Sequence, residues 1–174
     1  MILKSLKDKA IDKRIRRELQ REGERYLSAP GDIRSLAIII DYDKLADIRP
    51  LLQLATALNV ANEKVFILGY VEKVHKSVNY LIPVFSEATV KGNGLVRSNE
   101  VQDFLSRNYD LLINYYGQAT PVMKLMTVLT RASFKVGLSA DLSDFNDLTL
   151  LTEPGDFENF RDELVKYLKI LSNK

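Results

Sequence analysis

Two aspartates lie at the end of the most apolar run in the sequence and could do acid–base or metal chemistry. Asp41 and Asp43 close the run LAIIIDYD, residues 36–43. Spaced two apart on an extended chain, their carboxylates would face the same way and could bind a cation or act as general acid and base. The alternative is that each caps a helix or fills a turn, as aspartate often does after a strand. The sequence offers no convincing third ligand, so we expect no metal site.

A second group of polar residues follows a later apolar run, in the segment DLLINYYGQATP at residues 110–121. Gly117 permits a tight turn, and Thr120 followed by Pro121 is a favourable start for a helix. The amino end of that helix could seat a phosphate, although every crossover needs such a turn and a simple scaffold corner is favoured. Ligands of open parallel sheets bind beyond the carboxyl ends of the strands. The ligand-binding candidates are therefore Asp41, Asp43, Tyr70, Asn114, Tyr115, Gly117, Gln118 and Thr120.

Catalytic groups are otherwise sparse. The chain has no cysteine, and its single histidine, His75, lies between lysines where a solvent-facing position is favoured. Neither a G-x-G-x-x-G dinucleotide fingerprint nor a P-loop is present, and Gly92-Asn93-Gly94 is typical of a hairpin-like turn. We assign no catalytic residue and expect no cofactor, which favours a protein that is not an enzyme.

Apolar runs alternate with amphipathic segments along most of the chain. We expect strands at 36–41, 65–70, 110–115, 134–138 and 148–151, with a short extra strand at 83–85 as an option, and helices at about 46–58, 99–106, 120–132 and from 157 onward. The pattern predicts an α/β fold: a three-layer Rossmann-like sheet, mostly parallel, of about five strands, preceded by a basic N-terminal helix.

The basic character of the chain belongs to that first helix. Residues 1–26 hold nine Lys or Arg and five Asp or Glu, a net charge of +4, and the rest of the chain carries −2. We expect residues 1–28 to form a basic amphipathic helix and residues 29–174 a single α/β domain. The partner or nucleic-acid candidates are Lys9, Lys13, Arg14, Arg17 and Arg21. Interspersed acids dilute their field, so docking of the apolar stripe (which includes Leu3, Leu6, Ile11 and Ile15) on the domain or on a second copy is favoured over nucleic-acid binding.

Composition places the chain among soluble globular proteins, and the absence of cysteine fits the cytoplasmic location that we expect. Apolar residues make up 46% and charged residues 28%, the usual proportions for such proteins. No run is long enough to span a bilayer, and we expect that the charged N-terminus does not act as a signal peptide.

Four segments carry a resemblance that extends over nearly the whole chain. They are LAIIIDYD, NEVQDFLSRNYDLLINYY, RASFKVGL and DFENFRDELVKYLKIL. Together with the basic leading helix, they resemble a small uncharacterised bacterial family known only as a domain of unknown function. The resemblance implies this fold and a cytoplasmic location, and it implies no activity.

A local likeness involves residues 110–117 and Lys135-Val136-Gly137. This segment is similar to a strand, turn, helix and strand in the N-terminal half of heptosyltransferase-like glycosyltransferases. That family has a glycine-rich loop where this chain has Asp41-Tyr42-Asp43-Lys44, and it needs a second domain for which 174 residues leave no room. The likeness concerns architecture and implies no transferase activity.

These observations favour a non-catalytic interaction or assembly module, whose partner is a protein and could be a second copy of the chain. One alternative is a small-molecule or phosphate-binding domain, or a small enzyme, that uses the strand-end pocket. Another is an RNA- or ribosome-associated protein that binds through the basic helix.

Overall fold

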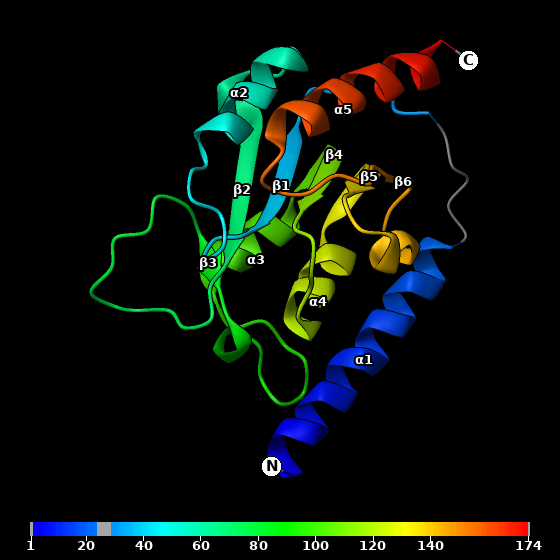
Figure 1. The fold of residues 1–174 in the computed structure, drawn as a ribbon. Helices are drawn as coiled ribbons and strands as arrows, with labels where there is room; N and C mark the ends of the chain where they lie inside the picture. The colour runs from blue at the N-terminus through cyan, green and yellow to red at the C-terminus, as the bar shows by residue number, and fades with distance from the viewer. Residues whose placement is uncertain (1, 24–28, 174) are drawn as a thin grey trace.

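A six-stranded, entirely parallel sheet with helices on both faces forms the body of the protein (Figure 1). The computed structural model describes residues 2–23 and 29–173. The strands are β1 (Leu36–Asp41), β2 (Val65–Tyr70), β3 (Val84–Phe85), β4 (Asn108–Tyr115), β5 (Arg131–Gly137) and β6 (Leu148–Thr149). The helices are α1 (Ile2–Glu22), α2 (Arg49–Ala57), α3 (Asn99–Ser106), α4 (Pro121–Leu129) and α5 (Phe157–Ser172), with 3-10 turns η1 (Asn62–Lys64), η2 (Glu87–Thr89) and η3 (Ala140–Phe145). The three-layer α/β prediction is confirmed, and the sixth strand is the short β3.

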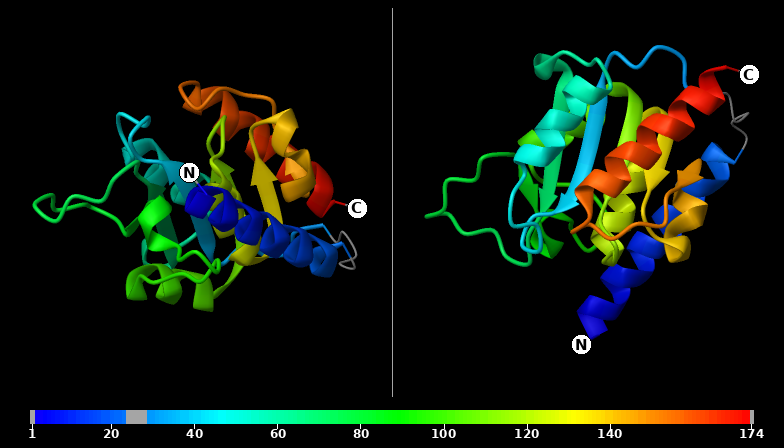
Figure 2. Two further views of the ribbon diagram at one scale, coloured as in Figure 1. Left: turned by 90° about the horizontal axis from the view of Figure 1, so that it is seen from below. Right: turned by 45° about the horizontal axis from the view of Figure 1, so that its top comes forward.

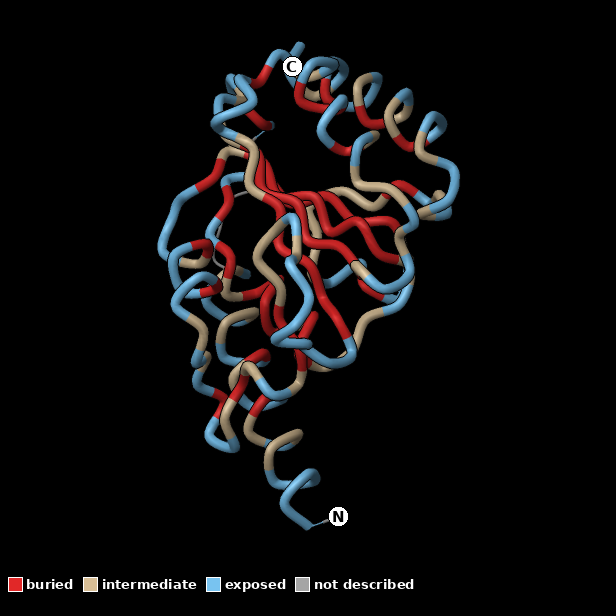
Figure 3. Tube along the Cα trace, turned by 90° about the vertical axis from the view of Figure 1, so that its left-hand side faces the viewer, coloured by how far each residue is buried: buried red, intermediate tan, exposed pale blue. Residues whose placement is uncertain are grey.

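The strand order β3-β2-β1-β4-β5-β6 reverses direction between β1 and β4. The chain first moves outward from β1 through β2 to β3, and then returns to the other side of β1 to begin β4. In β1, Ile38 pairs with Ile67 of β2 and Ile113 of β4. Every residue of β1 is buried (Figure 3), because a central strand is covered on both faces.

Among the described residues, two helices cover one face of the sheet and three lie on the other. On the first face, Leu54 of α2 and Phe160 of α5 pack against alternate residues of β1 and β4. On the second face, Phe104 of α3 and Met126 of α4 pack against the intervening residues. Figure 2 shows α1 running across the α4 side of this arrangement, and α1 and α4 are in contact. The sheet is therefore closed on both sides.

The middle of α1 is attached to the domain, whereas its first turn extends beyond it (Figure 1). Ile11 and Ile15 are buried against the domain. Near the other end of the helix, Glu22 forms an ion pair with the buried Lys135 of β5. Leu3, which the sequence pattern assigns to the docking stripe, is instead 82% exposed because it lies past the edge of the domain. Docking therefore uses the helix from about Lys7 onward and leaves out its first turn.

The structure differs from the predicted boundaries at the ends of helices and strands: α4 ends at Leu129 and β5 begins at Arg131, each three residues before the predicted position. The helix expected from about residue 46 begins at Arg49, where Pro50 fixes the first turn. The hairpin-like turn at Gly92–Gly94 is confirmed, since Val90 and Val96 form an antiparallel bridge around it and Gly94 has a φ of 79°. The predicted domain boundary at residue 28 lies outside the described residues.

Candidate functional site

The reversal of strand order between β1 and β4 marks the place where open parallel sheets bind their ligands. At this point the structure brings together Asp41, Tyr115, Gly117 and Gln118, four of the predicted ligand-binding candidates. The cavity that they line has a volume of only about 40 Å³. Pockets that bind small molecules start at about 300 Å³. The switch-point crevice is thus almost filled by the protein itself.

The segment between β6 and α5 covers the crevice. The hydroxyl of Tyr115 donates a hydrogen bond of 2.6 Å to the carbonyl oxygen of Pro154. The ring of Pro154 also lies 3.7 Å from where a Cβ on Gly117 would stand. Burial raises the pKa of Tyr115 to about 12, so its hydroxyl keeps the proton it donates at neutral pH. Lys44 completes the closure with an ion pair of 3.3 Å to Asp41.

The two aspartates of the opening pattern have separate partners. The chain turns directly after β1, with the backbone N–H groups of Lys44 and Leu45 donating to the Asp41 carbonyl oxygen. The carboxylate of Asp43 accepts a hydrogen bond of 2.7 Å from the backbone N–H of Glu72, which anchors the loop after β2. Within residues 2–23 and 29–173, no group of three His, Asp or Glu side chains could hold a metal ion.

Asn114 belongs to a buried polar network and not to an open site. It is 1% exposed, and its amide donates a hydrogen bond of 2.7 Å to the side-chain oxygen of Asn146. The hydroxyl of Thr127 donates to Asn114 over 3.0 Å, and the Tyr116 hydroxyl is bonded to Thr127 in turn. The network joins β4 to α4 and to η3. Sequence reasoning missed Thr127 and Asn146, although an asparagine inside a buried strand signals that partners must exist.

The two remaining ligand candidates lie on the other face of the sheet. Tyr70 packs edge-on against Phe85, with ring centroids 5.6 Å apart. Burial is the main cause that raises the pKa of Tyr70, and a hydrogen bond with Thr120 acts in the opposite direction. Thr120 also caps α4 by accepting a hydrogen bond from the Met123 N–H, as predicted from its position before Pro121. Neither residue lines the crevice.

A more open hollow of about 590 Å³ lies beside the crevice, beyond the carboxyl ends of β4, β5 and β6. Its lining includes Gln118, Ser139, Asp141 and Thr152. The Thr152 hydroxyl oxygen is buried and has no hydrogen-bond partner among the described residues. This hollow is large enough for a small ligand, and its lining also includes one cation, Lys44, and a second acid, Glu153.

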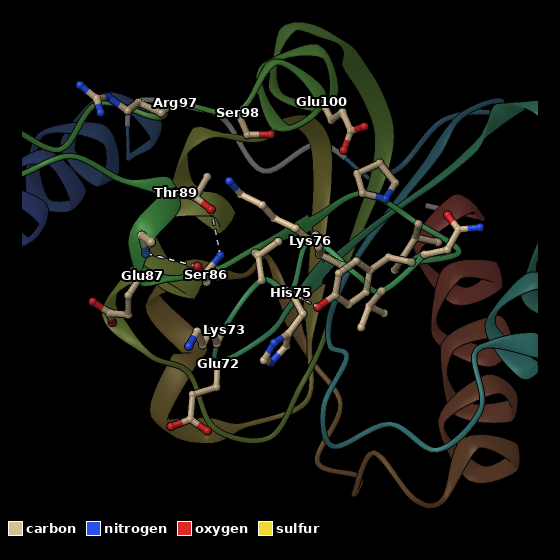
Figure 4. A pocket seen from close by; sticks show the side chains of 18 of the residues that line it. Glu72, Lys73, His75, Lys76, Ser86, Glu87, Thr89, Arg97, Ser98 and Glu100 are labelled. Atoms are coloured by element: carbon tan, nitrogen blue, oxygen red, sulfur yellow. Dashed lines mark hydrogen bonds between the residues drawn. The ribbon is translucent and has the colours of Figure 1, made fainter.

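A hollow of about 950 Å³ lies under the long loop between β2 and β3 (Figure 4). Its lining mixes cations such as Lys73 and Arg97 with acids such as Glu87 and Glu100. The hydroxyls of Ser86 and Thr89 also line it, and both already cap η2. The expected solvent-facing histidine is confirmed: His75 is exposed in this loop, where its backbone N–H donates to the Tyr80 hydroxyl.

The solvent side of α1 carries a different kind of surface. We define the outward face of α1 as Lys9, Lys13, Arg16, Arg17 and Gln20, all of which are exposed. One acid, Asp12, is exposed within the same lining, whereas Glu18 pairs with Arg21 at 3.5 Å and Glu22 pairs with the buried Lys135. No described acidic side chain lies within ion-pair distance of the first three cations of the face, and Arg17 has only a 4.0 Å contact with Glu18.

The five predicted partner residues therefore separate into two groups. Lys9, Lys13 and Arg17 lie on the outward face. Arg14 turns inward and donates to the carbonyl oxygen of Gly94, and Arg21 lies beside Glu18. Arg16 belongs to the face and was missed, although its three- and four-residue spacing from the others along a helix could have identified it.

Comparison with known proteins gives a family without an activity. Residues 7–171 match the model of a Family of unknown function (DUF6913). No curated protein and no solved structure matches the chain significantly. In the part of the chain that the structure describes, no helix combines the length and the apolar content needed to cross a membrane.

Proposed function

Since the chain belongs to that family of unknown function, which supplies no activity, we propose from the geometry that the protein is a non-catalytic interaction module whose outward face of α1 binds a polyanionic partner. One observation carries the proposal. On the outward face of α1, Lys9, Lys13, Arg16 and Arg17 are exposed beside one acid, Asp12, while Glu18 and Glu22 are engaged with neighbouring residues at the side and on the domain. Four cations against one acid leave this surface with a net charge of +3.

The dimensions of the outward face suit a polyanion. Lys9 and Gln20 are eleven residues apart in the sequence, which corresponds to about 17 Å along a helix. The screening length at physiological ionic strength is about 8 Å, so neighbouring cations on this face act together on an approaching anion. A partner with regularly spaced negative charges would contact several of them at once.

The attachment of α1 supports a binding role because it fixes this face before any partner arrives. The helix is held at three separate points: Lys7 bonds to the Glu87 carbonyl oxygen, Arg14 to that of Gly94, and Glu22 to Lys135. A surface that is already ordered loses less conformational entropy on binding than a flexible arm does. Since the apolar side of the helix faces its own domain, the cationic side is the one left for a partner.

Contacts at the ends of the strands support the part of the proposal that the module is non-catalytic. Tyr115 and Pro154 close the crevice at which this strand order usually places a ligand. Asp41, Asp43 and Asn114 each have a partner within the protein. The carboxylate of Asp41 and the hydroxyl of Tyr115 are therefore engaged within the protein, and the exposed Gln118 offers the crevice only an amide.

The test uses heparin as a generic polyanion and the full-length protein. The variant Lys13→Glu/Arg16→Glu should lose at least tenfold in affinity by isothermal titration, and the affinity of the wild type should fall steeply as salt is added. The matched control Lys64→Glu/Lys169→Glu makes the same change in net charge at exposed positions away from α1. Equal losses in the two variants would reduce the effect to net charge and contradict the proposal.

A second candidate function is the binding of a small anionic ligand in the 590 Å³ hollow. The observation in its favour is the buried Thr152 hydroxyl oxygen, which has no hydrogen-bond partner among the described residues. Inorganic phosphate, nucleoside phosphates and sugar phosphates should then raise the melting temperature of the wild type, and Thr152→Val should abolish the shift. If none of these compounds raises it, this candidate is rejected.

A further inference from the structure

The helical line that carries the outward cations continues into exposed apolar side chains at the start of α1. Ile2, Leu6, Lys9 and Lys13 follow one another at spacings of four, three and four residues, which places them on one side of a helix. Ile2 is 80% exposed and Leu6 is 56% exposed. The same side of α1 is thus apolar at its amino end and cationic farther along.

We define the apolar tip of α1 as Ile2, Leu3 and Leu6. Figures 1 and 3 show this end of the helix extending past the sheet and its covering helices. No described hydrophobic cluster of the domain includes any of the three side chains. Neighbouring exposed apolar residues of this kind mark sites of contact with a membrane or with another protein.

We propose that the polyanionic partner is the surface of an anionic membrane, on which α1 lies with its outward face toward the lipid. This inference rests on the proposed function, because it names the partner of the same face. The outward cations contact the phosphates of the headgroups, and the apolar tip enters the boundary between headgroups and acyl chains. The helix remains on the membrane surface, since no described helix can cross a bilayer.

A lipid surface would contact both the outward face and the apolar tip of α1, whereas RNA would contact the outward face alone. Phosphates of RNA would contact Lys9, Lys13, Arg16 and Arg17 but would leave Ile2 and Leu6 in water. The described part of α1 also has no aromatic residue on which a base could stack. Because α1 is already folded and held on the domain, binding would not require the coil-to-helix transition that free amphipathic peptides undergo.

Charge and apolar contact can be separated by sedimenting the full-length protein with vesicles. We expect the wild type to bind vesicles of phosphatidylcholine mixed with phosphatidylglycerol, and not vesicles of phosphatidylcholine alone. Each cation near an anionic surface contributes about fivefold to binding. The variant Lys13→Glu/Arg16→Glu should therefore lose more than tenfold in partitioning.

The apolar tip supplies the readout that is specific to lipid. Ile2→Ser/Leu6→Ser should reduce partitioning into the anionic vesicles at least fivefold while leaving heparin affinity unchanged. The matched control is Leu81→Ser/Leu151→Ser, at two positions that are 79% and 74% exposed elsewhere on the protein. This control should partition like the wild type.

The outcomes distinguish the two proposals. If the protein binds heparin through the outward face but ignores the anionic vesicles, or if the tip variant partitions like the wild type, the lipid inference is overturned and the interaction module stands. Tighter binding of duplex RNA than of vesicles, unaffected by the tip variant, would overturn it as well. If neither heparin nor vesicles bind, both proposals fail.

Discussion

The crevice between β1 and β4 and the outward face of α1 contain similar numbers of polar side chains, but those side chains have opposite surroundings. At the crevice, the hydroxyl of Tyr115 and the carboxylate of Asp41 already contact other groups of the protein. On α1, Lys13 and Arg16 have no acidic partner among the described residues. The crevice is the place that the strand order designates for a ligand, yet the helix face is the one with free charge.

The difference teaches that the partners of a polar side chain decide its availability, and that these partners often lie far along the chain. Tyr115 meets a carbonyl 39 residues away, and Glu22 meets a lysine 113 residues away. A buried polar group must find such a partner because burying it alone is costly. An exposed cation bears no such cost and can remain available for a binding partner.

The largest effect is expected from a change that removes the docking of α1. Ile11→Ala deletes most of a side chain that is fully buried against the domain, which should lower the free energy of unfolding by about 2–4 kcal/mol. Urea denaturation followed by circular dichroism measures the change. The neighbouring Lys9→Ala should stay within about 0.5 kcal/mol of the wild type, as surface substitutions generally do. An equally small effect of Ile11→Ala would mean that α1 does not pack on the domain in solution. The contrast between the closed crevice and a fixed outward face would then no longer hold.

The elements of the fold were predictable from the sequence wherever one local pattern was strong. The bounds of β1, β2 and α3 agree with the expected ranges, because the first two are continuous apolar runs and Ser98 is a clear cap. The end of α4 was placed three residues too late. Neither glycine nor proline follows Leu129 to mark the helix end, and Thr130 and Arg131 alone do not separate the helix from the strand.

The state of the candidate site was much less predictable. The sequence indicates that Asp41, Tyr115 and Gly117 come together at the strand ends, and it contains no local sign that Pro154 covers them. The outward orientation of the α1 cations likewise has no local sign in the sequence. It depends on which side of the helix Ile11 and Ile15 present to the domain, and on the burial of Lys135 opposite Glu22.

A pH titration tests whether the crevice is closed around Tyr115. The pKa of Tyr115 is about 12 in the folded protein because of burial, compared with about 10 for a tyrosine in the unfolded chain. Between these values the unfolded state has released a proton that the native state retains, so stability should fall as pH rises from about 10 toward 12. Urea unfolding at a series of alkaline pH values measures this slope.

The variant Tyr115→Phe isolates the contribution of this hydroxyl. It should cost about 1 kcal/mol at neutral pH through the lost bond to Pro154, and its stability should decline less steeply with pH. Part of the decline should persist, because burial also raises the pKa of Tyr109 and Tyr116. If the tyrosinate absorbance of the wild type minus that of the variant titrates near 10, Tyr115 is open to solvent and the crevice is not closed.

The smallest effect is expected at Lys44, which borders both the crevice and the neighbouring hollow. Its ammonium pairs with Asp41, but the lysine side chain is 68% exposed, and pairs of this kind contribute less than about 1 kcal/mol. Lys44→Ala should therefore change the free energy of unfolding only slightly in urea denaturation. It should also leave heparin affinity unchanged, since Tyr115 and Pro154 still close the crevice and the outward face of α1 is untouched. A large loss of affinity for any anion in this variant would place the binding site at the strand ends after all, because Lys44 is the cation that the two cavities share.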